Sequence, residues 1–553
     1  MSTNLLRLLA VFIFYAFVTA IWFAPILPHL SSSLLGPPED NLQDLWNSWY
    51  AAVGNAQGPH FFFTNLIKFP EGTTLYYHSI AYPQVLSIWL AVKAFGNSLP
   101  ALVSFQNLII LLSFPLAGVG AFCLSNHVTR NAWCSLLGGF VFAFNPSHVL
   151  HAMHHVHVAS IEFIPFFVLS YWLAIEKKSL AWLLATIAFF ALSALSCWYY
   201  LFYCFYFIIF HTTYQWFKER RAPQGWGIYI LAASLCGVGI VLSPWLVPMV
   251  KEALVGQNVY MGGTDYYVAD LLAYFTFPLR HFFGAFSVPI YREFSGNPWE
   301  ATAYLGLANI GIFVWLLINR LRSNRELIIY LTIGIVVFAI LASGSYLHIL
   351  GRDVFPMPDL LLSKIPFFRN IRAPSRAIVF VYLFLSVGLS LGMQLLFRET
   401  SQNHLLQRVA VAAALVLIAV DFFPLTISST QFSCSPGFSM VRDDPERGFG
   451  ILSLPLGYVS ENAAMAEQIC HGRPIVGGNT SRNVSLSLRD RLETYDLNVL
   501  REQLVRNKVK YVILHRPDGR IFRWHLEDGD WSNYPSSYQT VYEDASQVIL
   551  QTY

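Results

Sequence analysis

Three carboxylates lie within six residues near the start of the chain. Glu39, Asp40 and Asp44 belong to the segment Gly36–Trp49. A positioned carboxylate can act as a general base toward an attacking hydroxyl, and burial beside a low-dielectric boundary raises its pKa toward the working range. If the segment is helical, Asp40 and Asp44 are four residues apart on one face and can point into one cleft. A solvated acidic loop is the alternative interpretation.

A group of histidines follows the tripeptide Asn145-Pro-Ser. On a helix His151, His154 and His155 fall on one face. Imidazole suits transition metals and switches charge near neutral pH, so the cluster is compatible with a divalent metal or a phosphate clamp. No fixed zinc signature matches, and polar lining of an active-site cavity is the second interpretation. Further candidates for such a lining are His157, Asp270, Tyr76 and His78.

Basic residues gather in the segment Lys364–Arg376. It contains Arg369, Arg372 and Arg376 besides Lys364. The guanidinium group is a planar fork that fits phosphate oxygens and stays protonated. The segment therefore predicts a phosphate-binding site, and non-catalytic binding of lipid headgroups is the alternative.

The composition indicates that a membrane protein positions these residues. Of 553 residues, 55% are hydrophobic and 12% charged, whereas a soluble domain has roughly 25% charged residues. The mean hydropathy is +0.49, and a net charge of +3 implies no broad basic surface for nucleic acid. Hydropathy predicts an α-helical polytopic protein of about eleven transmembrane helices. The predicted spans are Leu8–Leu27, Leu102–Leu124, Trp133–Leu150, Ile161–Ile175, Leu180–Leu195, Trp198–Phe210, Trp226–Val250, Tyr304–Leu317, Leu327–Leu347, Ala377–Phe397 and Val409–Leu425.

The segment Val85–Phe95 decides the orientation of the rest. It contains Lys93 and is too short to cross roughly 30 Å of hydrocarbon, so we interpret it as re-entrant or interfacial. With a cytoplasmic N-terminus, the short basic loops then fall inside, as the positive-inside rule requires. Three long loops fall outside, namely 28–101, 251–303 and 348–376. The Arg cluster is therefore on the side that the rule depletes of positive charge, which favours a specific anionic partner.

The tail, residues 428–553, is more polar than the membrane part, residues 1–427. It combines a helix-like stretch, Arg489–Asn507, with the strand-like runs Tyr511–Leu514 and Gln547–Gln551. We expect a small extracytoplasmic α/β domain. Cys434 and Cys470 both lie in it and could form a disulfide in an oxidising compartment.

Several common nucleotide and hydrolase motifs are missing. The sequence has no GxxxxGK[ST], no GxSxG, and no GxGxxG in a strand-to-helix context, which disfavours ATP-driven transport, an esterase and a dinucleotide-binding domain. The energy for a reaction must then come from the substrate, and a lipid-linked sugar carries an activated phosphate leaving group.

Five motifs, in this order and on this side of the membrane, resemble bacterial GT-C superfamily glycosyltransferases. They are Asp40-x-x-Gln43-x-x-Trp46-Asn47-x-Trp49, Pro59-x-Phe-Phe-x-Thr64 with Phe69-Pro70-x-Gly72, the segment Pro146–His157, Arg372-Ala-Pro-Ser-Arg376, and His471-Gly-Arg-Pro474-Ile-Val-Gly-Gly478. The resemblance implies a GT-C-like transmembrane domain, a polyprenyl-phosphate-sugar donor, inverting transfer and an acidic catalytic base in the first outside loop. By this resemblance Asp40 is the base, with Asp44 and Glu39 as alternates, because the acidic cluster is denser than the family's single aspartate.

The resemblance also implies partners and a location. Arg372 and Arg376 would contact the donor phosphate, and a cell-envelope glycan, a lipid or a protein would be the extracytoplasmic acceptor. The expected location is the bacterial cytoplasmic (inner) membrane. Two alternatives stay open, namely a transporter or flippase of lipid-linked saccharides, and a polymerase or ligase of lipid-diphosphate-linked glycan. The inverted repeats of many transporters are not visible in the sequence.

Overall fold

The computed structural model describes residues 3–57, 60–220, 224–255, 265–320, 324–400, 404–482, 486–492, 496–516 and 536–553. Pro59 of the first-loop motif and residues 256–264 of the second outside loop lie outside these ranges, as do residues 493–495 within the predicted tail helix.

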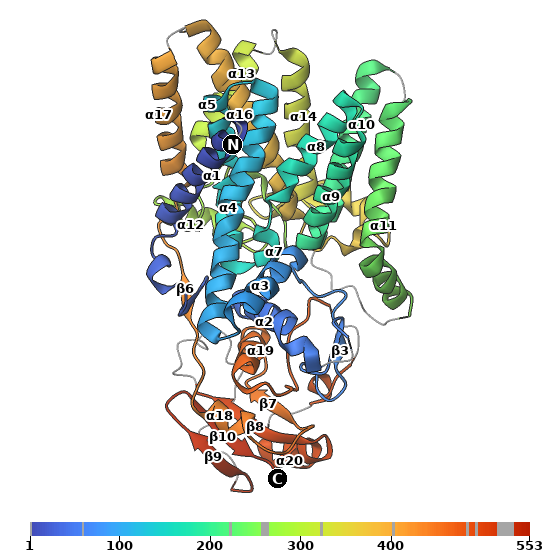
Figure 1. Cartoon of the computed structure of the whole chain (residues 1–553), viewed down its shortest axis with the longest axis vertical. Helices are drawn as coiled ribbons and strands as arrows, with labels where there is room; N and C mark the ends of the chain where they lie inside the picture. The colour runs from blue at the N-terminus through green and yellow to red at the C-terminus, as the bar shows by residue number, and fades with distance from the viewer. Residues whose placement is uncertain are drawn as a thin grey trace.

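Long helices standing side by side form the upper part of the molecule in Figure 1. Each of the eleven predicted spans overlaps one of them, although Trp133–Leu150 and Leu327–Leu347 run several residues past the helix ends. The overlap confirms a polytopic helical fold. These helices are α1 (Thr3–Trp22), α4 (Leu99–Thr129), α5 (Ala132–Ala143), α8 (Phe163–Lys177), α9 (Leu180–Ser196), α10 (Trp198–Glu219), α11 (Trp226–Val255), α13 (Leu307–Arg320), α14 (Arg325–Ala342), α16 (Ile378–Thr400) and α17 (His404–Phe422). Within the described residues, seven candidate spans are long and apolar enough to cross a membrane, and α5, α9 and α13 are shorter apolar helices.

Helix α16 is the centre of this layer. The candidate span that contains it, Pro374–Phe397, is wholly buried, whereas only 22% of the spans at α1, α11 and α17 is buried. A helix that is hydrophobic on all sides belongs in a core, and α16 packs against α4, α5, α13 and α14. The turn η5 (Pro374–Ala377), directly before α16, therefore has a rigid support.

Short elements cover the lower ends of these helices (Figure 1). Helix α3 (Tyr82–Phe95), the segment that we interpret as re-entrant or interfacial, has 14 residues, about 21 Å at 1.5 Å per residue, and packs on α2 and α4. The helical elements of this region are η1 (Leu27–His29), α2 (Asp40–Ala52), η2 (Gly54–Gln57), α6 (Pro146–His154), α7 (Val156–Ala159), η3 (Leu271–Tyr274), α12 (Gly284–Glu293), α15 (Asp359–Leu362) and η4 (Phe368–Asn370). The strands are β1 (Ser33–Leu35), the pair β2 (Phe63–Thr64) and β3 (Thr73–Thr74), and the pair β4 (Tyr346–Ile349) and β5 (Arg352–Pro356).

The tail has the predicted α/β character. Its sheet has the strand order β7-β8-β10-β9, in which β7 runs parallel to β8 and the other neighbours are antiparallel. The strands are β7 (Gly450–Leu454), β8 (Val509–His515), β9 (Gln539–Glu543) and β10 (Gln547–Gln551), and the helical elements are α18 (Gly437–Arg442), α19 (Tyr458–His471), η6 (Arg489–Arg491) and α20 (Leu497–Arg506). Both predicted strand-like runs are strands, and η6 and α20 occupy the predicted helical stretch.

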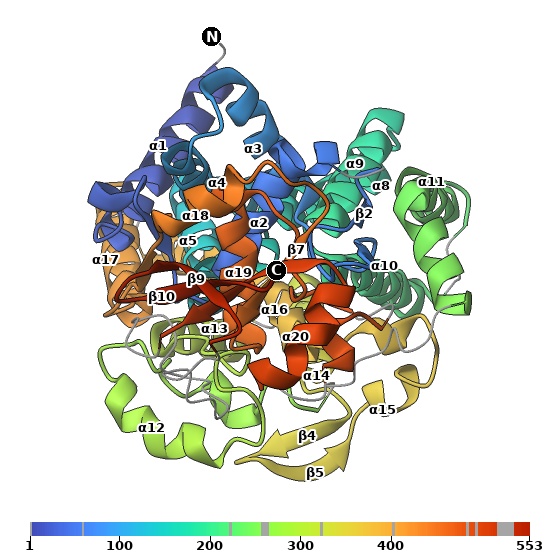
Figure 2. The same cartoon turned by 90° about the horizontal axis from the view of Figure 1, so that it is seen from below.

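The tail and the first outside loop share one hydrophobic core. Trp46 of α2 is fully buried in a cluster that also contains Ile451 of β7 and Met465 of α19. The indole of Trp46 donates a hydrogen bond of 2.6 Å to Gln468 Oε1, and β1 pairs antiparallel with β6 (Ser429–Gln431). Seen from below, the tail lies across the helix ends (Figure 2). A domain boundary near residue 428 stays a prediction.

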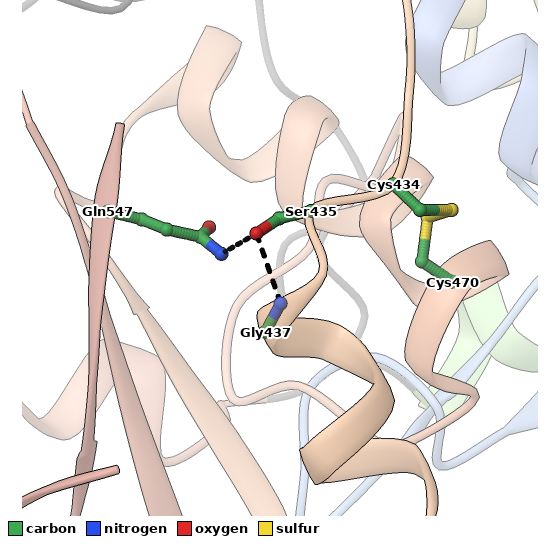
Figure 3. Close-up of a disulfide and its surroundings, with 5 residues drawn as sticks. All are labelled: Cys434, Ser435, Gly437, Cys470 and Gln547. Atoms are coloured by element: carbon green, nitrogen blue, oxygen red, sulfur yellow. Dashed lines mark hydrogen bonds between the residues drawn. A yellow bond between two sulfur atoms is a disulfide. The ribbon is translucent and has the colours of Figure 1, made fainter. Parts of the chain in front are cut away.

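A disulfide joins Cys434 to Cys470, the pair that the sequence offered (Figure 3). It connects the segment after β6 to the last turn of α19. Beside it, Ser435 Oγ accepts hydrogen bonds from Gln547 Nε2 at 2.7 Å and from the Gly437 N–H at 3.3 Å. Strand β10 is thereby tied to the same segment.

Candidate active site

A cavity of about 870 Å³ lies where the helix ends, the outside loops and the tail meet. Its lining comes from the start of α2, the histidine segment α6 to α7, the start of α10, the end of α11, the loop residues 297–300 and 366–376, and the tail. Asp40, Arg372 and His155, predicted from three separate segments, all line it.

Asp40 is the first residue of α2, where the helix dipole favours a negative charge. Its Oδ2 lies 2.7 Å from His155 Nδ1, while its Oδ1 accepts hydrogen bonds from the Tyr458 hydroxyl and from Asn462 Nδ2. Burial raises the pKa of Asp40, but the charge of His155 and the hydrogen bonds outweigh it and lower the pKa to about 2. Asp40 is therefore ionised at neutral pH.

His155 stands between two carboxylates. Its Nε2 lies 3.8 Å from Glu300 Oε1. Burial lowers the pKa of His155, yet the neighbouring Asp40 reverses this and leaves it above the usual value. Two lining carboxylates therefore flank an imidazole that favours the protonated state.

Glu300 is bound by Arg376 of the predicted phosphate motif. Arg376 Nε donates to both carboxylate oxygens, at 3.1 and 3.3 Å, its Nη2 donates to Oε1, and the Ser375 hydroxyl donates at 3.2 Å. Burial raises the pKa of Glu300, but Arg376 outweighs it and holds the pKa well below the usual range. The Arg376 guanidinium also stacks 4.7 Å from the ring centroid of Tyr199.

Arg372 has a different environment. Its Nη2 donates a 3.0 Å hydrogen bond to the Tyr267 hydroxyl, and its guanidinium lies 4.9 Å from the centroid of that ring. Its buried Nε has no hydrogen-bond partner among the described residues, and no carboxylate pairs with it there. Arg369 is exposed and does not line the cavity.

Three side chains could hold a divalent metal ion, although they differ from the predicted trio. One ligand atom each of His151, His155 and Glu300 lies within 4.8 Å of the others. Burial lowers the pKa of His151 to about 3, which leaves a neutral imidazole suited to a metal. His154 is directed elsewhere, because its Nδ1 lies 3.1 Å from Glu39 Oε2. Imidazole and carboxylate ligands fit such an ion, but Arg376 already occupies both Glu300 oxygens.

Comparison with family models identifies one match. Residues 8–423 match the model described as domain of unknown function (DUF6311), about three quarters of the chain. The chain belongs to the DUF6311 family. A search of the curated proteins found no match for it.

Solved structures share the fold of this DUF6311 protein. The Archaeoglobus fulgidus oligosaccharyltransferase tethered with an acceptor peptide containing the NVT sequon has a TM-score of 0.53 at 10% identity. Its apo form has a TM-score of 0.52 at 12% identity, and in both cases the match covers 92% of this chain and 69% of that one. ArnT from Cupriavidus metallidurans bound to undecaprenyl phosphate is similar over 99% of this chain and 98% of that one, with a TM-score of 0.39 at 11% identity. The chain therefore shares the fold of the archaeal oligosaccharyltransferase, in agreement with the fold that the sequence motifs predicted.

Five of the predicted residues lie outside the cavity lining of the DUF6311 protein, and the exposed Arg369 is one of them. Asp44 is buried and accepts a 3.0 Å hydrogen bond from the Val156 N–H at the start of α7; burial raises its pKa to about 7. Asp270 caps η3 and accepts from the N–H groups of Leu272 and Gly351, each at 2.9 Å. His78 is buried 2.8 Å from Asn47 Oδ1, and Tyr76 stacks on Phe62. These contacts hold the loops in place.

Sequence reasoning did not single out several lining residues. Glu300 was one of many polar residues in its loop, and only the fold brings it to Arg376 and His155. Tyr458 and Lys68 line the same cavity as Asp40, but Tyr458 lies in the tail that the sequence separates from the membrane part. The glycine-rich segment at 477–478 was the one local signal that the tail approaches the first loop closely.

One wall of the cavity in the DUF6311 protein is apolar. Leu246, Met249, Val250 and Leu254 of α11 line the cavity, as do Phe202 and Phe367. Leu254 is 81% exposed. Pro244 and Pro248 lie inside α11, and its lower part stands apart from the neighbouring helices in Figure 1.

Proposed function

We propose that this protein is an integral-membrane glycosyltransferase that moves a sugar from a polyprenyl-phosphate-linked donor to an extracytoplasmic acceptor. Asp40, with Glu39 beside it, is the catalytic carboxylate, and Arg372 contacts the donor phosphate. The observation that carries the proposal is that Asp40 and Arg372 line the same cavity.

The apolar wall supports a lipid-linked donor. Exposed aliphatic side chains on α11 offer a surface along which a prenyl chain would run from the membrane to the cavity. Arg372 lines the same cavity and has no carboxylate partner among the described residues, and its free Nε would meet phosphate oxygens. ArnT, which is bound to undecaprenyl phosphate in its structure, agrees with this class of ligand.

The transfer step follows from the two ends of the site. Asp40 accepts a hydrogen bond from the acceptor hydroxyl and orients it toward the anomeric carbon. With a pKa of about 2 Asp40 is a weak base, so it takes the proton only as the new bond from oxygen to carbon forms. The bond from that carbon to the phosphate oxygen breaks, and its electron pair leaves with the lipid phosphate, which Arg372 stabilises. Attack opposite the leaving group gives inversion.

Arg376 has a supporting role in this proposal. Its contact with Glu300 keeps a buried carboxylate ionised beside His155, and His155 in turn holds Asp40. Arg376 thus positions the catalytic carboxylate through two neighbours, while its positive charge adds to the field felt by the leaving group.

We further propose that the cavity faces away from the cytoplasm, in the inner membrane of a bacterium. The positive-inside distribution of the short loops supports this orientation. The Cys434–Cys470 disulfide supports it as well, because disulfides persist in oxidising compartments. The acceptor is a cell-envelope glycan, a lipid or a protein; an acceptor peptide is tethered to the archaeal oligosaccharyltransferase.

One experiment separates transfer from transport. The purified protein is incubated with a polyprenyl-phosphate sugar in nanodiscs, and free polyprenyl phosphate is measured. A glycosyltransferase releases it in the presence of an acceptor, whereas a transporter or flippase releases none. A polymerase or ligase acts on a lipid-diphosphate-linked glycan instead. If the protein released lipid from that donor and not from the polyprenyl-phosphate sugar, it would be a polymerase or ligase.

A further inference from the structure

The cavity has a second polar end, on the side of the tail. Lys68 of the first outside loop, Glu461 of α19 and Arg489 of η6 line it. None of these three residues has a part in the transfer step described above.

Each carboxylate that lines the cavity already has a basic partner. Asp40 is paired with His155 and Glu39 with His154. Glu300 is bound by Arg376, and Glu461 Oε2 lies 3.0 Å from Arg489 Nη2. Glu461 also accepts from the Gly478 N–H at 3.2 Å. In the part of the chain that the structure describes, no lining carboxylate is therefore left to form an ion pair with a further cation in the cavity.

Lys68 is such a cation. Its side chain belongs to a residue only 6% exposed, and no hydrogen bond or ion pair of its ammonium group exists among the described residues. Burial lowers the pKa of Lys68, and the negative charges of Glu461 and Asp490, neither of which forms an ion pair with it, oppose this change. Lys68 lines the cavity, so a ligand bound there could supply the ion pair that its ammonium group lacks.

The backbone of Lys68 has an unusual conformation. Lys68 has φ of +57°, in the left-handed region that a non-glycine residue rarely adopts. Its N–H donates to the Gly477 carbonyl at 2.9 Å, and its carbonyl accepts from the Gly72 N–H at 2.9 Å. Contacts from the tail and from its own loop therefore hold a sparsely populated conformation, as is common at binding sites.

We propose that Lys68 is the centre of a second anion-binding subsite of this cavity, which holds a phosphate or carboxylate group other than the phosphate at Arg372. Arg489 borders the subsite but is engaged by Glu461, so Lys68 supplies the direct contact. Assigning this anion to the acceptor rests on the proposed function, and it makes the acceptor an anionic molecule. The other source of the same chemistry is the outer phosphate of a lipid diphosphate.

The test uses the full-length protein in nanodiscs of zwitterionic lipid. Binding of inorganic phosphate is measured by calorimetry with undecaprenyl phosphate already bound, and binding of undecaprenyl phosphate and undecaprenyl diphosphate is measured separately. Lys68→Met is compared with Lys68→Arg, which keeps the charge. The matched control is Lys508→Met, because Lys508 has φ of +58° but is exposed and does not line the cavity.

We expect Lys68→Met to weaken phosphate binding at least tenfold, with Lys68→Arg and Lys508→Met close to the unaltered protein. If only inorganic phosphate binds more weakly, the anion belongs to the acceptor; if the diphosphate binds more weakly while the monophosphate does not, it is the outer phosphate of the donor. If a folded Lys68→Met protein binds inorganic phosphate and undecaprenyl diphosphate as tightly as the unaltered protein does, the proposal is overturned. Affinity for undecaprenyl monophosphate tests the proposed donor site independently, through Arg372→Met.

Discussion

The hydroxyl of Tyr458, in the tail, donates a hydrogen bond to Asp40 Oδ1, the carboxylate oxygen turned away from His155. These two residues are 418 positions apart in the sequence. Under the proposed mechanism the acceptor hydroxyl needs this same oxygen. Tyr458 therefore occupies the acceptor's place at the catalytic carboxylate.

Replacing Tyr458 by Phe should improve acceptor binding. The change removes a competing hydroxyl and leaves Asp40 ionised through His155. A hydrogen bond to a charged group contributes about 1.5–3 kcal/mol, and Tyr458 is half exposed, so we expect KM for the acceptor to fall by up to about tenfold with kcat within threefold. Steady-state kinetics at fixed donor measure both. A loss of kcat beyond a hundredfold would instead make Tyr458 part of the catalytic machinery.

Asp40→Asn should abolish most transfer. A positioned acid or base contributes roughly 10²–10⁴-fold to a rate, so we expect a loss of that size, with normal expression and normal binding of undecaprenyl phosphate. Asp44→Asn is the matched control, since Asp44 binds the Val156 N–H and does not line the cavity. Equal losses of transfer in the two variants would contradict the assignment of Asp40, rather than Asp44, as the catalytic carboxylate.

The pH dependence of stability should reveal Asp44. Its pKa is raised to about 7 in the folded protein, from an ordinary value of 3.8, so between about pH 4 and 7 the folded state binds more protons than the unfolded state. Stability from this residue is therefore full at low pH and falls as the pH rises. We expect the Tm of the Asp44→Asn variant to fall less between pH 5 and pH 7.5 than the Tm of the unaltered protein does. Parallel curves for the two proteins would contradict the raised pKa.

Breaking the pair of Glu300 and Arg376 should destabilise the protein. Both side chains are nearly buried, at 5% and 10% exposed, and removing one partner of a buried ion pair costs about 3–5 kcal/mol. We expect Glu300→Gln to lower Tm by several degrees, and the double variant with Arg376→Met to recover part of the loss. A Glu300→Gln protein as stable as the parent would mean that water reaches the pair.

Removal of divalent metal should leave transfer nearly intact. Arg376 neutralises Glu300 and occupies both of its oxygens, so an ion at His151 and His155 would have to displace a guanidinium group. We expect activity within twofold after chelation with EDTA. A loss of activity would assign a metal to these three residues if Mn²⁺ or Zn²⁺ restored the activity of the unaltered protein but not that of the His151→Ala variant.

The sequence predicted the fold well because hydropathy is a local property. Runs of apolar residues placed each of the eleven predicted spans over a helix, although only seven candidate spans among the described residues are long and apolar enough to cross a membrane. They also located two of the tail strands, β8 and β10. Asp40, Arg372 and the histidines were found because their residue types are unusual where they occur. Glu300, Tyr458 and Lys68 were not singled out, because their importance lies in contacts between distant segments. Asp44 has the same residue type as Asp40, and only the fold separates a carboxylate that lines the cavity from one that binds backbone.

The shared core of α2 and α19 has a consequence for biosynthesis. Trp46 and the strand β1 emerge from the ribosome about 400 residues before Gln468 and β6, their partners. Under the proposed orientation, the segment that carries Asp40 lacks these contacts until the last span has been inserted and the tail has been translocated. Under the proposed function, the nascent chain is therefore inactive, and a protein truncated before α19 should insert into the membrane yet transfer no sugar.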